Sequence, residues 1–110
     1  MNSLKDQIFE YVKKYRSVTY AELNQNIVGF RGNRMSLVPE IPSIVYWSGL
    51  SDEAYEAIAE LLNEKRVFHN ASTPQQYLRA GGGLTIPIVK SNKITKELRW
   101  LPVVLSVQKE

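Results

Sequence analysis

The chain of 110 residues has no cysteine, a single histidine and no apolar run near the roughly 18 residues that a membrane-spanning helix needs. Without cysteine there can be no disulfide and no thiolate metal site, and such a composition is typical of a reducing compartment. The N-terminal MNSLKDQIF lacks the apolar stretch of a signal peptide. We therefore expect a cytoplasmic protein with no membrane partner, folded as one domain at residues 1–107 with a short tail at 108–110.

Groups that could perform catalysis are also scarce. His69 stands beside Phe68 in an apolar stretch, where a lone histidine is far more often structural than a base or a ligand. The three glycines at 81–83 follow an expected helix and lack the Walker lysine, so they are typical of a helix stop and not of a phosphate loop. We expect a protein that is not an enzyme and that holds no cofactor and no metal.

The charge is unevenly distributed along the chain. The net charge is +3, yet residues 51–66 hold five Asp/Glu and only two Lys/Arg, whereas residues 67–110 hold six Lys/Arg and two Asp/Glu. Such a surface attracts a polyanion to some faces only. The acidic face at 52–64 is either an ordinary solvated surface or a docking face for a basic protein partner.

Periodicity and capping residues predict four helices, at 3–16, about 20–26, 51–66 and 74–80. Thr19 and Glu22 match a capping box, and Thr73 followed by Pro74 is a typical helix start. The first helix has an apolar stripe, which consists of Leu4, Ile8, Tyr11, Val12 and Tyr15. On a helical wheel of the third helix, apolar residues fill one arc and acids the other; the apolar arc holds Ala54, Tyr55, Ile58, Ala59, Leu61 and Leu62.

Strands are harder to place than helices. Glycines and prolines make residues 28–50 irregular, and we predict a single short strand there, at 43–47. Residues 67–70 are the end of a connection or a short strand. Residues 84–89 and 98–107 predict a hairpin with a long polar tip, although Pro87 and Pro102 each remove a ladder donor and so require an edge, a strand end or a bulge.

The element order is that of a winged helix. It predicts an α+β winged helix-turn-helix with a long connection before the third helix and a C-terminal β-hairpin wing. Element order alone does not fix packing, so an α+β domain of another topology stays open.

Two basic segments are candidate nucleic-acid sites. Lys90, Lys93 and Lys96 recur every third residue at the expected wing tip, followed by Arg99. They indicate phosphate binding or, equally, a solvated turn. Arg31 and Arg34 flank a flexible backbone next to Phe30, a mixture that suits single strands; the alternative is a plain loop with Phe30 in the core.

Aromatic residues supply further candidates. Tyr46, Trp47 and Trp100 could each stack on a base if exposed. Each is individually more typical of a core residue, because aromatics provide much of the buried area of a small domain.

The stretches SIVYWSGLSDEAYEAI, LTIPIV and RWLPVVL, in this order, resemble a family. The chain is similar, over about residues 1–107, to the small winged-helix single-stranded-DNA-binding proteins of staphylococcal cassette-type mobile genetic elements. The resemblance implies a winged-helix fold, a preference for single strands, and a role in replication, repair or recombination of the element.

The sequence therefore leaves three candidate functions open. The first is binding of single-stranded DNA by the residues named above. The second is a sequence-specific duplex regulator, for which the outward arc of the third helix offers only Asn63 as a base-reading side chain, with Lys65 and Arg66 at its end. The third is a protein-interaction adaptor of a replication complex, which would dock a partner through the acidic face at 52–64.

Overall fold

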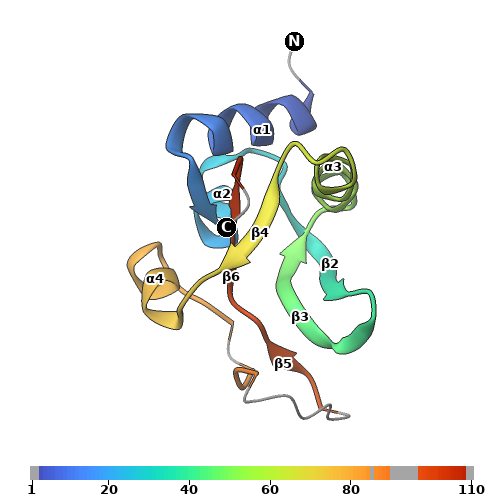
Figure 1. The fold of residues 1–110 in the computed structure, drawn as a ribbon, viewed down its shortest axis with the longest axis vertical. Coiled ribbons are helices and arrows are strands. Elements are labelled where there is room, and N and C mark those ends of the chain that lie inside the picture. The colour runs from blue at the N-terminus through green and yellow to red at the C-terminus, as the bar shows by residue number, and fades with distance from the viewer. Residues whose placement is uncertain (1–2, 85, 90–96, 109–110) are drawn as a thin grey trace.

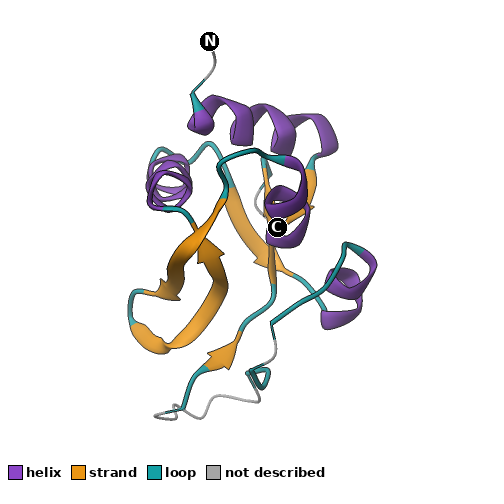
Figure 2. Ribbon diagram, turned by 180° about the vertical axis from the view of Figure 1, so that it is seen from behind, coloured by secondary structure: helices purple, strands orange, loops and turns teal. Residues whose placement is uncertain are grey.

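The structure is a computed structural model that describes residues 3–84, 86–89 and 97–108. This part of the chain is an α+β fold with four helices and two three-stranded sheets (Figures 1 and 2). In chain order the elements are α1 (Leu4–Tyr15), β1 (Ser17–Thr19), α2 (Tyr20–Asn26), β2 (Arg31–Val38), β3 (Ile41–Leu50), α3 (Asp52–Asn63), β4 (Phe68–Ala71), α4 (Pro74–Arg79), β5 (Arg99–Trp100) and β6 (Val103–Ser106). None of these helices is long and apolar enough to cross a bilayer.

The capping residues determine where the helices begin, as predicted. The Ser3 hydroxyl accepts a hydrogen bond from the backbone of Asp6, which fixes the start of α1. The Thr19 hydroxyl accepts from the Glu22 backbone at 3.1 Å while the Glu22 carboxylate reaches back to the Thr19 backbone, which completes the capping box of α2. Both helices end within a residue of the predicted positions. Tyr15 is the exception in the first stripe, because it is 52% exposed.

The first sheet is antiparallel and has the order β1-β6-β4. It brings together the strand after α1, the strand after α3 and the last strand, and α1 and α3 pack against each other beside it (Figure 1). Residues 67–70, which the sequence left undecided, are thus largely the strand β4.

The second sheet corrects the prediction for residues 28–50. Instead of an irregular connection with one short strand, β2 and β3 form a long antiparallel hairpin, and β5 joins β3 in parallel. The pairing has several register shifts, so that Arg31 and Arg34 both lie opposite Leu50. These bulges interrupt the alternation of apolar and polar residues by which a strand is recognised in a sequence. The backbone at Gly32 passes close to the backbone of Ser51. A Cβ at Gly32 would lie 2.5 Å from the Cα of Ser51, so this close approach requires glycine.

The predicted hairpin of 84–89 with 98–107 is not present in the described residues. Ile88 forms only an isolated parallel bridge with Trp100, and β6 pairs with β1 and β4 instead. Pro102 separates β5 from β6, and the two strands belong to different sheets. A proline cannot donate a ladder hydrogen bond, so a strand end at this point is expected.

Tyr77 of α4 links the two sheets, because its ring contacts Trp47 and Trp100 of the second sheet and its hydroxyl contacts β6 of the first. The rings of Trp47 and Tyr77 stack at 5.4 Å, and Trp100 meets Tyr77 edge-on at 4.8 Å. The Tyr77 hydroxyl donates to the carbonyl of Val103 at 2.6 Å and accepts from the backbone N–H of Tyr20 at 3.3 Å. Because the first N–H groups of a helix have no partner within the helix, this phenol from α4 satisfies one of the donors at the start of α2.

The wheel of α3 is confirmed in its main features. Ala54, Ile58 and Leu61 are buried, and the acids lie on the exposed side. The inward arc is shifted by a residue or two, since Ala57 is buried and Ala59 is exposed. Ser51 caps the helix by accepting from the backbone of Ala54 at 3.0 Å.

Candidate nucleic-acid interface

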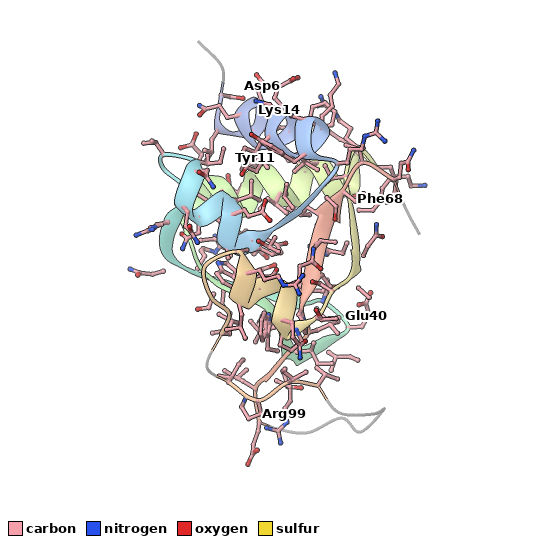
Figure 3. The ribbon with its side chains drawn as sticks, turned by 90° about the vertical axis from the view of Figure 1, so that its left-hand side faces the viewer. Asp6, Tyr11, Lys14, Glu40, Phe68 and Arg99 are labelled. Carbon is pink, nitrogen blue, oxygen red and sulfur yellow. The ribbon has the colours of Figure 1, made fainter. Side chains whose placement is uncertain are left out.

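Of the four cations predicted for the wing, the structure describes Arg99 alone. Lys90, Lys93 and Lys96 lie outside the described residues. Arg99 is on β5, where its guanidinium donates to the carboxylate of Glu97 at 3.2 Å. It lies at the opposite end of the molecule from α1 (Figure 3).

Arg31 and Arg34 lie on the exposed part of β2 and not on a flexible loop, which corrects the prediction of their setting. Arg31 donates to the backbone carbonyl of Asn24 at 3.1 Å. Arg34 lies over the ring of Tyr55, 4.0 Å from its centroid, and contacts the carboxylate of Asp52 at 3.4 Å. Because the Arg34 and Asp52 side chains are 43% and 81% exposed, this ion pair adds little stability and leaves the guanidinium accessible.

Three of the four predicted stacking residues are core residues. Phe30, Trp47 and Trp100 are 0%, 5% and 2% exposed, so no base can stack on them in this conformation. The Trp100 indole donates to the carbonyl of Tyr46 at 3.1 Å and is thereby fixed in place. Tyr46 is half-buried and is the accessible ring of the set.

Tyr46 lines a pocket of about 380 Å³ between the β2–β3 hairpin and α3. We call it the hairpin pocket. Its wall includes three rings that come from three different elements, those of Tyr46 on β3, Tyr55 on α3 and His69 on β4. Apolar groups complete most of the wall; the other lining residues are Ser36, Leu37, Pro39, Leu50, Ile58, Ala59, Leu62 and Asn63. The pocket is of the kind that takes a flat, largely apolar group.

His69 gives the pocket an uncharged wall. Burial lowers the pKa of His69 to about 4, so the imidazole is neutral at pH 7. A nitrogen of the ring lies 2.6 Å from the hydroxyl of Tyr20, and the ring centroid lies 4.2 Å from that of Tyr46. Burial also raises the pKa of Tyr46, with a smaller contribution from Glu40, so its phenol remains protonated. The rings therefore offer hydrogen-bonding groups without a formal charge.

The acids of α3 are partly neutralised by the chain itself. The ammonium of Lys5 on α1 lies 2.8 Å from the carboxylate of Glu64 and 4.0 Å from that of Glu60. The hydrogen bond from Lys5 is the main reason that the pKa of Glu64 is lowered. Glu53 and Glu56 remain exposed, and the described residues give them no ion pair.

Sequence reasoning did not assign Tyr55, His69 and Ser36 to a site. Tyr55 was expected on the inward arc of α3 and His69 as a structural residue. The structure brings them together only because the hairpin folds against α3 and β4. No local pattern could have indicated this meeting, since the three residues are separated by long stretches of chain.

In the described residues, no group of three or more His, Asp or Glu side chains is placed to hold a metal ion. No family model, no curated protein and no solved structure shows a significant match to the chain. The candidate site therefore stands on its geometry alone.

Proposed function

We propose that the protein binds single-stranded DNA through the hairpin pocket and the cations beside it. The observation that carries this proposal is the Arg34 guanidinium, which lies over the ring of Tyr55 where that ring lines an aromatic pocket. An unpaired base could enter between Tyr46 and Tyr55, while Arg34 and Arg31 bind the phosphates on either side. Stacking on aromatic rings and a positively charged path for the backbone are the usual means of binding single strands.

The architecture supports a winged-helix variant as the scaffold. The order α1, β1, α2, α3, β4, β6 and the antiparallel sheet β1-β6-β4 are those expected of a winged helix, and the β2–β3 hairpin would be an insertion between its second and third helices. The long segment between β4 and β6 would be the wing, with Lys90, Lys93 and Lys96 as further phosphate contacts. The family resemblance adds the proposal of a role in replication, repair or recombination of a mobile genetic element.

A duplex regulator is less compatible with these features. A helix-turn-helix places two helices around a tight turn and reads bases with the second one. Here a hairpin of two strands separates α2 from α3, and the exposed side of α3 carries Glu53, Glu56 and Glu60. Carboxylates there would repel the phosphates that line the major groove.

Fluorescence anisotropy with labelled single- and double-stranded oligonucleotides, across a salt series, tests the proposal. Affinity for the single strand should be higher and should fall steeply with salt, because each neutralised phosphate releases counterion. Tyr46→Ala should weaken binding by about 1–3 kcal/mol, the usual contribution of one stacked base. Arg34→Ala should weaken it as well, whereas Arg79→Ala, an exposed arginine on α4, is the matched control. Equal or tighter duplex binding by the wild-type protein would refute the preference for single strands.

An adaptor function remains the second candidate, because Glu53 and Glu56 are exposed and carry no ion pair in the described part of the chain. A basic partner of a replication complex could dock there. The charge swap of Lys90, Lys93 and Lys96 to Glu separates the two functions. It should weaken DNA binding, because it replaces further phosphate contacts with like charges, and it should spare a partner held by α3. A protein that binds no nucleic acid even at low salt would favour the adaptor.

A further inference from the structure

The C-terminal end of α1 combines exposed cations with exposed tyrosine. Lys13, Lys14 and Arg16 are all exposed, and Tyr15 between them is 52% exposed. Tyr11 and Tyr15 are in contact, with ring centroids 4.7 Å apart, and the Lys14 ammonium lies 5.2 Å from the Tyr15 centroid. Figure 3 looks onto this side of the molecule and labels Tyr11 and Lys14 on α1. We call these five residues the α1 terminal surface.

Four of the seven other lysines and arginines in the described residues form ion pairs. Lys5, Arg34, Arg66 and Arg99 each contact a carboxylate. The three cations of the α1 terminal surface form no such ion pair among the residues that the structure describes. Their position near the negative end of the helix dipole is favourable for cations, which accounts for the charge but not for the exposed tyrosine ring beside it.

A hollow adjoins the surface on the side toward the last strand. It has a volume of about 270 Å³ and is lined by Lys13 and Arg16 together with Ser106, Val107 and Gln108. The Ser106 hydroxyl, on a residue that is 8% exposed, accepts from the backbone of Gln108 at 3.2 Å, and a hydroxyl can also donate its own proton to a ligand. Two cations and a hydroxyl around one hollow suit an anionic oxygen group such as a phosphate.

We propose that the α1 terminal surface is a second contact for the same single strand, with a phosphate in the hollow and an unpaired base on Tyr15. This inference rests on the proposed function. A phosphate between Lys13 and Arg16 places the adjoining nucleotide beside the tyrosine, whose ring is free to stack. A duplex offers no unpaired base for Tyr15, so the surface selects single strands.

The position of the surface predicts a dependence on oligonucleotide length. Lys5, near the start of α1, contacts α3, whereas Tyr15 lies ten residues further along the helix, about 15 Å away at the rise of an α-helix. Figure 1 shows the β2–β3 hairpin, which forms the hairpin pocket with α3, on the side of α3 away from α1, so the pocket is separated from the α1 terminal surface. A short oligonucleotide can occupy one contact only, and a longer one gains affinity by occupying both.

The test compares the wild type with the double variant Lys13→Gln and Arg16→Gln, using oligothymidylates of about 6 and 25 nucleotides. The matched control is the double variant Lys65→Gln and Arg79→Gln, which removes the same charge from exposed positions elsewhere. We expect the Lys13/Arg16 variant to lose about tenfold or more in affinity for the longer strand. Its salt dependence should also be shallower by about 1.4 in slope, as for two lost phosphate contacts to a single strand. The control variant should change little.

Substitutions of Tyr15 test the stacking contact separately from the charge, because they leave the net charge of the protein unchanged. Tyr15→Phe should bind like the wild type, since the ring is retained, and Tyr15→Ser should lose about fivefold or more for the longer strand. If the wild type binds single strands and the Lys13/Arg16 variant and Tyr15→Ser bind equally well, only this inference is overturned. Equal losses in the control variant overturn it too, because the effect would then be one of net charge. If the wild type binds no single strand, the proposed function and this inference fall together.

Discussion

Lowering the pH from 7 to 5 should destabilise the fold chiefly through His69. Burial lowers the pKa of this imidazole from 6.5 to about 4. Between those values the unfolded chain takes up a proton that the folded chain does not. The stability that depends on the neutral ring is thus fully present above pH 6.5, declines as the pH falls below that value, and reaches its lowest level near pH 4.

The size of the effect follows from the pKa shift. One pKa unit corresponds to about 1.36 kcal/mol, and about 1.5 units separate 6.5 from pH 5. The free energy of unfolding should therefore fall by about 2 kcal/mol between pH 7 and pH 5. Carboxylates contribute at lower pH, since the stabilisation by Glu64, whose pKa is lowered mainly by Lys5, is lost only as the pH falls below about 4.5. His69 is the only histidine, so no other imidazole contributes.

Urea denaturation at pH 7, 6 and 5, followed by tryptophan fluorescence, measures the effect directly. His69→Gln is the informative variant, because a side-chain amide can still hydrogen-bond to the Tyr20 hydroxyl but does not titrate. Its free energy of unfolding should be nearly constant over this range, whatever its absolute value. The reasoning is refuted if the wild type loses less than about 0.5 kcal/mol, or if the variant loses as much as the wild type.

Three further predictions concern the fold and the acidic helix. Tyr77→Phe should lower the free energy of unfolding by about 1–3 kcal/mol in a urea titration, because it leaves the buried N–H of Tyr20 and the buried carbonyl of Val103 without the phenol that they contact. Tyr55→Phe is the control. It removes a hydroxyl at a half-buried position and should lower the free energy of unfolding far less. Gly32→Ala should destabilise by about 1–3 kcal/mol, since its methyl would overlap the backbone at the start of α3; a thermal melt unchanged from the wild type would contradict this close crossing. Glu53→Lys with Glu56→Lys should raise duplex affinity more than single-strand affinity, because these carboxylates repel a duplex that approaches α3. An unchanged ratio of the two dissociation constants would contradict that repulsion.

The helices could be predicted because their signals are local. Ser3, Thr19, Ser51 and Thr73 each accept a hydrogen bond from a backbone N–H a few residues later, so the cap and its partner lie in one short stretch of sequence. The periodicity of α3 likewise depends on its own residues alone. These predictions did not require knowledge of what packs against each helix.

The hairpin and the site could not be predicted in the same way. The strand β2 lacks the expected alternation because its pairing with β3 shifts at several bulges. Trp47 and Trp100 have the composition of a stacking platform, and only the packing of Tyr77 between them shows that they are core. The hairpin pocket depends on contacts between β2, β3, α3 and β4, which are non-local by nature.

The distribution of ion pairs explains how an acidic helix is compatible with a proposed DNA-binding protein. Lys5 and Arg66 contact the acids at the end of α3, and Arg34 contacts Asp52 at its start. These contacts reduce the repulsion among the helix's own carboxylates. They leave the exposed centre of the helix negative, so a polyanion is excluded from that face and directed elsewhere. The β2 strand and the C-terminal end of α1 are two described regions where exposed cations meet exposed or half-buried rings; Arg66, which lies over the ring of Phe9, is a third but is paired with Glu64. Single-stranded DNA bound at the first two regions would pass around α3 and not across it. We therefore expect the acidic helix to orient the DNA by repulsion, without contacting it.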